Sequence, residues 1–179
     1  MATAYIDRVD RTWMRVLTWF AIAALVAIDA LYLSIINLQG GPDAPDVLTV
    51  PFVATFLALM AICLRASLLA PARVKLPLRA AASAGLVVMG MIGAFSIGLL
   101  ILVVAGLSIA VTAGTPATRL GSIIAAGIAS VAVVGILVIG FEISWHHIVC
   151  PATGSGGGTT AGFVSQTAYS CQNGVLTIP

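Results

Sequence analysis

Long uninterrupted apolar runs dominate the pattern of hydrophobic and polar positions along this 179-residue chain. Short segments separate these runs, and they carry five of the eight prolines. A helix needs about 20 apolar residues to cross the hydrocarbon core of a bilayer. Only helices and closed barrels satisfy their backbone amides there, and runs without a period of two favour helices. The pattern therefore predicts transmembrane helices over Val16–Ile36, Leu48–Leu69, Ala80–Ala113 and Arg119–Phe141.

The third run is unusually long for a single span. As one helix it would measure about 50 Å, against a hydrocarbon core of about 30 Å. It must therefore tilt, protrude or break, and its glycines offer places to do so. Splitting it gives two short halves with no turn chemistry between them. One span over Ala80–Ala113 is therefore the preferred interpretation.

The residues after the fourth helix form a tail without Asp, Glu, Lys or Arg. Residues 153–162 are rich in Gly, Ser and Thr, which is typical of a flexible linker. The segment Phe163–Ile178 predicts a short β-hairpin around Asn173-Gly174, a favoured two-residue turn. The expected fold is an all-α integral membrane protein: a four-transmembrane-helix bundle over residues 1–145, and a tail over 146–179. Alternation along the hairpin places four side chains on one face, those of Tyr169, Cys171, Leu176 and Ile178.

Composition supports a lipid environment for most of the chain. Hydrophobic residues make up 60% of it and charged residues 8%, and the mean hydropathy is +1.14. A soluble domain carries about 25% charged residues. The net charge is +2, and the eight basic residues are spread over the loops. The expected partner is therefore the lipid bilayer, and no nucleic-acid-binding surface is indicated.

The positions of the basic residues predict the orientation in a plasma membrane. Cytoplasmic loops carry an excess of Lys and Arg, so the N-terminus is expected in the cytoplasm. Arg119 then falls on the other side, together with Asp43 and Asp46, and four crossings return the tail to the cytoplasm. An uncharged tail with two cysteines would suit an exported segment better, so its side stays open. The basic residues on the N-terminal side are Arg8, Arg11, Arg15, Arg65, Arg73, Lys75 and Arg79.

Asp29 is the most informative single residue because it lies within the first span. A charged side chain inside a membrane is costly, and such residues often line a path for ions or substrates. Asp29 is therefore a candidate proton or cation site. The alternative is a structural role, in which the carboxyl group is protonated or bonds across a helix interface.

Glu142, His146, His147 and Cys150 form a cluster of metal-capable side chains near the end of the fourth helix. Glu142 and His146 are four residues apart, so they would share a helix face and could hold a divalent metal. A structural role at the membrane interface is the favoured alternative, and no cofactor is predicted. Cys150 and Cys171 could instead pair as a disulfide if the tail is exported.

Small residues recur at a spacing of four along the last two spans. Such stripes let helix backbones approach closely in lipid. They therefore predict packing between these helices, with other membrane subunits, or between copies of the chain. The stripes consist of Gly90, Ala94 and Gly98 in the third span and of Gly121, Ala125 and Ala129 in the fourth.

Three hypotheses for the function follow. The first is a non-enzymatic accessory, assembly or scaffold subunit that packs with other membrane helices. The alternative is a small oligomeric transporter or channel that uses Asp29. The third is a metal or redox membrane enzyme that uses Glu142, His146, His147 and Cys150.

Overall fold

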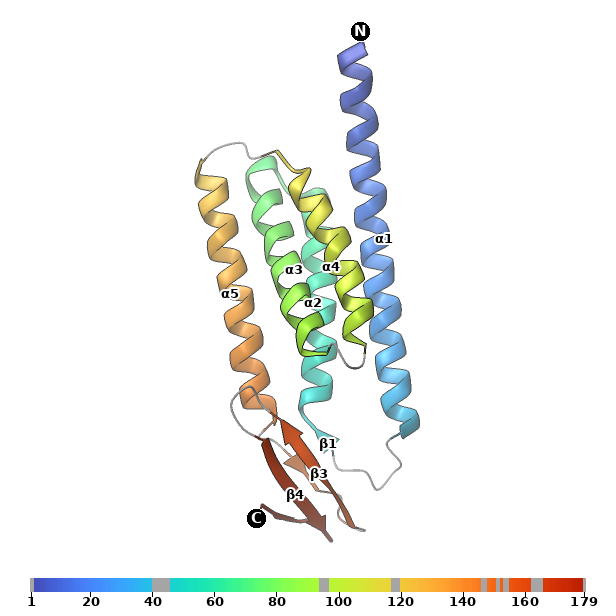
Figure 1. Cartoon of the computed structure of the whole chain (residues 1–179), viewed down its shortest axis with the longest axis vertical. Coiled ribbons are helices and arrows are strands. Elements are labelled where there is room, and N and C mark those ends of the chain that lie inside the picture. The colour runs from blue at the N-terminus through green and yellow to red at the C-terminus, as the bar shows by residue number, and fades with distance from the viewer. Residues whose placement is uncertain are drawn as a thin grey trace. The chain divides into compact units, whose positions relative to one another are not determined.

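The computed structural model describes residues 2–39, 46–93, 97–116, 120–145, 148–150, 152, 155–161 and 166–178. These residues form mostly helix, with short strands between the helices and in the tail (Figure 1). The helices are α1 (Ala2–Gln39), α2 (Thr49–Leu69), α3 (Ala72–Ile92), α4 (Gly98–Ala113) and α5 (Leu120–Trp145). The strands are β1 (Asp46–Val47), β2 (Ile148–Val149), β3 (Ser155–Ala161), β4 (Gln166–Gln172) and β5 (Val175–Thr177).

Four of these helices are long and apolar enough to cross a membrane, as the sequence predicts. Their candidate spans cover parts or all of α1, α2, α3 and α5. The fifth helix, α4, is apolar but has only 16 residues. The candidate spans are Thr12–Leu38, Thr49–Leu69, Ala72–Ile92 and Leu120–Ser144.

The prediction of one continuous third helix over Ala80–Ala113 is wrong. The structure has two helices there, because α3 ends at Ile92 and α4 begins at Gly98. The amide of Gly98 donates a hydrogen bond to the Gly93 carbonyl at 2.7 Å, which closes the turn between the two helices. A Cβ atom on Gly98 would collide with the backbone of Gly93 and of Gly90. Glycine therefore permits a turn that sequence patterns alone do not reveal.

The helices α3 and α4 form an antiparallel hairpin. Arg79 contacts Thr115, just after α4, and Ser83 contacts Thr112 and Ser108 further back along it. Gly90 lies against Leu102, closer still to the turn. As residue numbers rise along α3, those of the partners fall, so the chain leaves the hairpin at the end where it entered.

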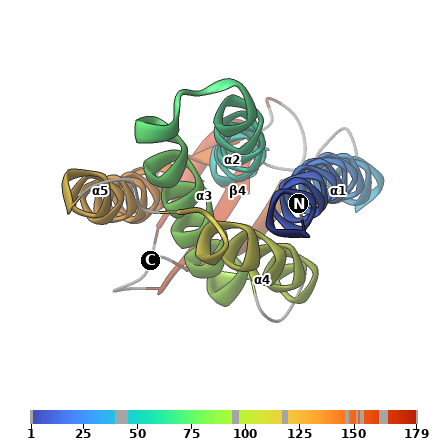
Figure 2. The ribbon, with the colours of Figure 1, turned by 90° about the horizontal axis from the view of Figure 1, so that it is seen from above.

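The chain divides into two compact units, and the hairpin belongs to the first. This unit comprises Met1–Asp29 and Leu57–Gly135. Within it, α1 and α5 lie at opposite edges of the helices (Figures 1 and 2). Most of the largest fully buried side chains of this unit are apolar and come from α1, α2, α3 and α4; they include Leu25, Leu57, Met60, Leu64, Leu86 and Ile101.

The second unit comprises Ala30–Phe56 and Ile136–Pro179 and contains the strands. Strand β1, between α1 and α2, pairs antiparallel with β2, which follows α5. The remaining strands form a three-stranded antiparallel sheet in the order β3-β4-β5. The expectation of a flexible linker over residues 153–162 is wrong for residues 155–161, which form β3 and pair with β4 along the whole strand; residues 153, 154 and 162 lie outside the described residues.

The hairpin turn lies where the sequence predicts it. Asn173 and Gly174 have φ angles of 47° and 81°, the left-handed values that a two-residue turn of this kind requires. Across the strands, Cys171 pairs with Leu176, so both face the same side. The ring of Tyr169 covers Gly158, where a Cβ atom would lie 3.1 Å from the tyrosine hydroxyl.

Candidate functional site

Asp29 lies in α1 with one carboxylate oxygen, Oδ1, buried. In the part of the chain that the structure describes, Oδ1 has no hydrogen-bond partner. A buried polar atom without a partner carries a desolvation cost that a bonded one avoids. The structure thus places a polar, hydrogen-bond-accepting atom inside a candidate membrane span.

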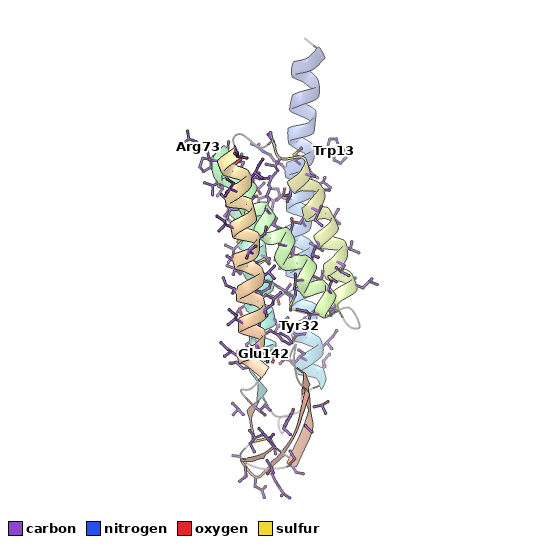
Figure 3. The ribbon with its side chains drawn as sticks, turned by 60° about the vertical axis from the view of Figure 1, so that its left-hand side comes forward. Trp13, Tyr32, Arg73 and Glu142 are labelled. Atoms are coloured by element: carbon purple, nitrogen blue, oxygen red, sulfur yellow. A yellow bond between two sulfur atoms is a disulfide. The ribbon has the colours of Figure 1, made fainter. Side chains whose placement is uncertain are left out.

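The expected metal cluster is only partly visible. Glu142 is half-buried and lies near the end of α5 (Figure 3). His146 and His147 lie outside the described residues. Among the residues described, no three metal-capable side chains lie together.

Cys150 is bonded to Cys171 in a disulfide, with Cα atoms 5.5 Å apart. A sulfur in a disulfide has no thiolate to offer a metal, because the ligand form of cysteine is the thiolate. The bond attaches β4 to the segment that follows β2. Cys171 is buried, whereas Cys63 in α2 is a free cysteine.

The two small-residue stripes lie in different surroundings. Gly90 and Gly98 do not share one helix face, because they belong to α3 and α4 and meet across the turn between them. Ala94 lies outside the described residues. Gly90 and Gly98 therefore pack within the hairpin.

On α5, Gly121 and Ala125 are exposed and Ala129 is half-buried. Within 4 Å of a Cβ atom built on Gly121 or Gly127 there is nothing among the described residues. Ser122 and Ala126, one position further along, are buried. Gly121 and Ala125 are therefore exposed next to a face of α5 that is buried.

A buried polar network links α3 and α4, and sequence reasoning missed it. Ser83 is hydrogen-bonded to Ser108 at 2.8 Å and to Thr112 at 3.0 Å. Its hydroxyl also lies 2.9 Å from the carbonyl of Arg79, one turn earlier. The four-residue spacings from Arg79 to Ser83 and from Ser108 to Thr112 carry the signal, but only a hairpin brings the two pairs together.

Sequence reasoning also did not single out Arg79 as a site residue. It is only 6% exposed, yet it is charged and lies within α3. Its Nε donates to Ser67 Oγ at 3.2 Å, and its Nη1 donates to Thr115 Oγ1 at 2.7 Å. These two bonds connect α3 to α2 and to the residues just after α4.

A cavity of about 330 Å³ lies beside Arg79. Arg15 of α1 and Lys75 of α3 also line it, so three basic side chains surround one cavity. Its other lining residues are Thr115 and apolar or small side chains, and no lining residue that the structure describes is acidic. Pockets that bind small molecules have volumes of about 300–1,000 Å³.

Comparison with known proteins identifies no relative: no family model, curated protein or solved structure matches the chain.

Proposed function

We propose that the chain is a non-enzymatic accessory or assembly subunit of the plasma membrane. Its N-terminus lies in the cytoplasm, its disulfide-bonded tail lies outside, and α5 packs against a membrane helix of another subunit. The observation that carries this proposal is the open small-residue face of α5, next to a face that is already packed.

The proposed orientation follows from the α3–α4 hairpin. A hairpin returns the chain to the side from which it came, whether it spans the bilayer or enters it only partway. Three single crossings remain, those of α1, α2 and α5, and an odd number places the tail opposite the N-terminus. The four crossings expected from the sequence place the tail in the cytoplasm, but that number depends on a single third helix.

The distribution of charge supports the same orientation. With three crossings and a hairpin, Arg119 precedes α5 on the N-terminal side and joins the other seven basic residues. Asp43 and Asp46 fall on the opposite side, with the tail. All eight Lys and Arg residues then obey the positive-inside rule. The Cys150–Cys171 disulfide also fits an oxidising compartment.

The exposed face of α5 supports a partner helix. Lipid tails are as apolar as leucine, so helices associate in membranes mainly through close packing over small residues. Gly121 and Ala125 offer such a place, with Ile124 and Ile128 beside them, 55% and 65% exposed. Ser122 and Ala126 already pack inside the chain, which leaves the adjacent stripe for a helix from outside it.

Purification in mild detergent after cross-linking in the membrane tests this proposal. The wild-type chain should carry a cross-linked partner, and Gly121→Leu with Ala125→Leu should remove it because the larger side chains block close approach. Gly106→Leu is the matched control, since Gly106 on α4 also faces open space. A chain that runs alone as a monomer, or a partner retained in the Gly121→Leu/Ala125→Leu variant, would contradict the proposal.

The buried Oδ1 atom of Asp29 favours a second candidate, a small transporter or channel. Intramembrane carboxylates often carry protons or cations, and a group without a described partner is free to bind one. In liposomes, Asp29→Asn should then abolish proton or cation flux, whereas Ser34→Ala, five residues later in α1, should leave it unchanged. Flux that survives Asp29→Asn would eliminate this candidate.

A further inference from the structure

We propose that the cavity beside Arg79 binds a phosphate group, held by Arg79, Lys75 and Arg15. The cavity lies wholly within the first unit, between α1, α2, α3 and the residues after α4. Phosphate chemistry has two possible sources, the headgroup of an anionic lipid and free phosphate. The binding chemistry does not depend on the proposed function; only the lipid source relies on the proposed orientation.

Arg79 is held in a fixed position on the cavity wall. The Ser67 hydroxyl donates its hydrogen to the Leu64 carbonyl at 2.7 Å, and that of Thr115 donates to the Val111 carbonyl at 2.8 Å. Each hydroxyl has only one hydrogen, so both present lone pairs to Arg79. The guanidinium group has five N–H donors, and these two contacts involve Nε and Nη1. The guanidinium group of Arg79 is therefore oriented before any ligand binds, and its remaining N–H donors lie beside the cavity.

The charge of Arg79 has no counter-ion in the part of the chain that the structure describes. Its hydrogen-bond partners there are hydroxyl groups, which are neutral. Buried charges in proteins are generally paired, because an unpaired one loses its hydration without compensation. A buried guanidinium group beside a cavity therefore favours an anion in that cavity.

Two further cations converge on the same cavity. Lys75 precedes Arg79 by four residues and so shares its face of α3, and Arg15 comes from α1. Clefts lined by charges of one sign attract counter-ions strongly, because the potentials add. Repulsion between like charges makes such a cluster unfavourable when it is empty. An anion with several oxygens would relieve that repulsion.

The donor set matches phosphate better than a single carboxylate. Arginine binds phosphate oxygens in pairs through its planar fork, and lysine adds a compact point charge. Basic pockets between helices on the cytoplasmic side of membrane proteins bind anionic lipid headgroups. Met14 and Leu68 line the same cavity and would contact the apolar part of a lipid.

The full chain in nanodiscs allows a direct test by thermal unfolding, since a ligand of the folded state raises the midpoint. Three conditions are compared: phosphatidylcholine alone, phosphatidylcholine with inorganic phosphate, and phosphatidylcholine with phosphatidylglycerol. Lys75→Gln and Arg15→Gln remove one charge each without touching the bonds of Arg79. Arg73→Gln is the matched control, because Arg73 is exposed on α3 and projects away from the helices (Figure 3).

The midpoint of the wild-type chain should rise with phosphatidylglycerol or with inorganic phosphate. A rise with the lipid alone supports a headgroup, and a rise with inorganic phosphate supports free phosphate. Lys75→Gln and Arg15→Gln should each weaken binding about fivefold, and Arg73→Gln should not. No rise in either condition, or an undiminished rise in the Lys75→Gln/Arg15→Gln variant, would overturn the proposal.

Discussion

Asp46 of β1 and Val149 of β2 are backbone partners in an antiparallel pair, although α2, α3, α4 and α5 separate them in the sequence. The pair connects the loop after α1 with the segment after α5. Strand β1 follows the C-terminal end of α1, and β2 follows the C-terminal end of α5. These two helix ends therefore lie on the same side within the second unit. This relationship agrees with an odd number of crossings between the N-terminus and the tail, independently of the charge distribution.

The turn between α3 and α4 should be sensitive to any side chain at Gly98. We expect Gly98→Ala to lower the free energy of unfolding by about 2 kcal/mol, because a Cβ atom there meets backbone that must move. Gly106→Ala on the same helix faces open space and should leave stability within about 0.5 kcal/mol of wild type. Denaturant unfolding in detergent micelles measures both. Equal effects would indicate that the two helices do not meet at Gly98.

The bonds of Ser83 to α4 should contribute measurably to the hairpin. Ser83→Ala removes the contacts with Ser108 and Thr112 and should cost about 1 kcal/mol, within the range measured for polar contacts between membrane helices. Ser34→Ala is the control, since Ser34 is exposed and bonds only to the Ala30 carbonyl of its own helix among the contacts described.

A double-mutant cycle with Ser108→Ala isolates the contact between Ser83 and Ser108. The two substitutions should be non-additive, because either one already breaks the bond. Strict additivity in the unfolding free energies would show that the hydroxyl groups act independently.

The Cys150–Cys171 bond should stabilise the tail and leave the helices unaffected. It closes a loop with a sequence separation of 21 residues, and a loop of this size is worth about 3 kcal/mol in the chain-entropy model. Cys150→Ala with Cys171→Ala should therefore speed hydrogen exchange in β3, β4 and β5. Exchange in α3 and α4 should not change, and Cys63→Ala should alter neither region. Unchanged exchange in the three strands would contradict this role.

The apolar runs alone predict most of the helices, because a helix that crosses a bilayer needs a minimum length of apolar residues and such long runs are uncommon in other folds. The turn at Asn173-Gly174 can also be predicted from the sequence, because its backbone angles favour those two residue types. The break between α3 and α4 is different. It depends on the close backbone approach at Gly98, and glycines elsewhere in the same run, such as Gly106, cause no break.

The candidate site shows a similar division. Asp29 stands out in the sequence because a carboxylate within an apolar run is rare. Arg79 does not stand out, because in the sequence it looks like the last charge of a basic loop. Arg79 becomes buried only because α3 begins before Lys75 and continues through Pro77. Its guanidinium group then donates hydrogen bonds to Ser67 and Thr115. Such partners lie far apart along the chain, so spacing cannot identify them.

In the proposed orientation, the tail and the N-terminus lie on opposite sides of the membrane. Reporter cysteines at Thr3 and at Ile178, each in a chain whose own cysteines are replaced by alanine, can be labelled in intact cells with a membrane-impermeant maleimide. Ile178→Cys should react at once, and Thr3→Cys should react only after permeabilisation. An Ile178→Cys chain that stays unlabelled until the membrane is opened would contradict the topology and the proposed orientation.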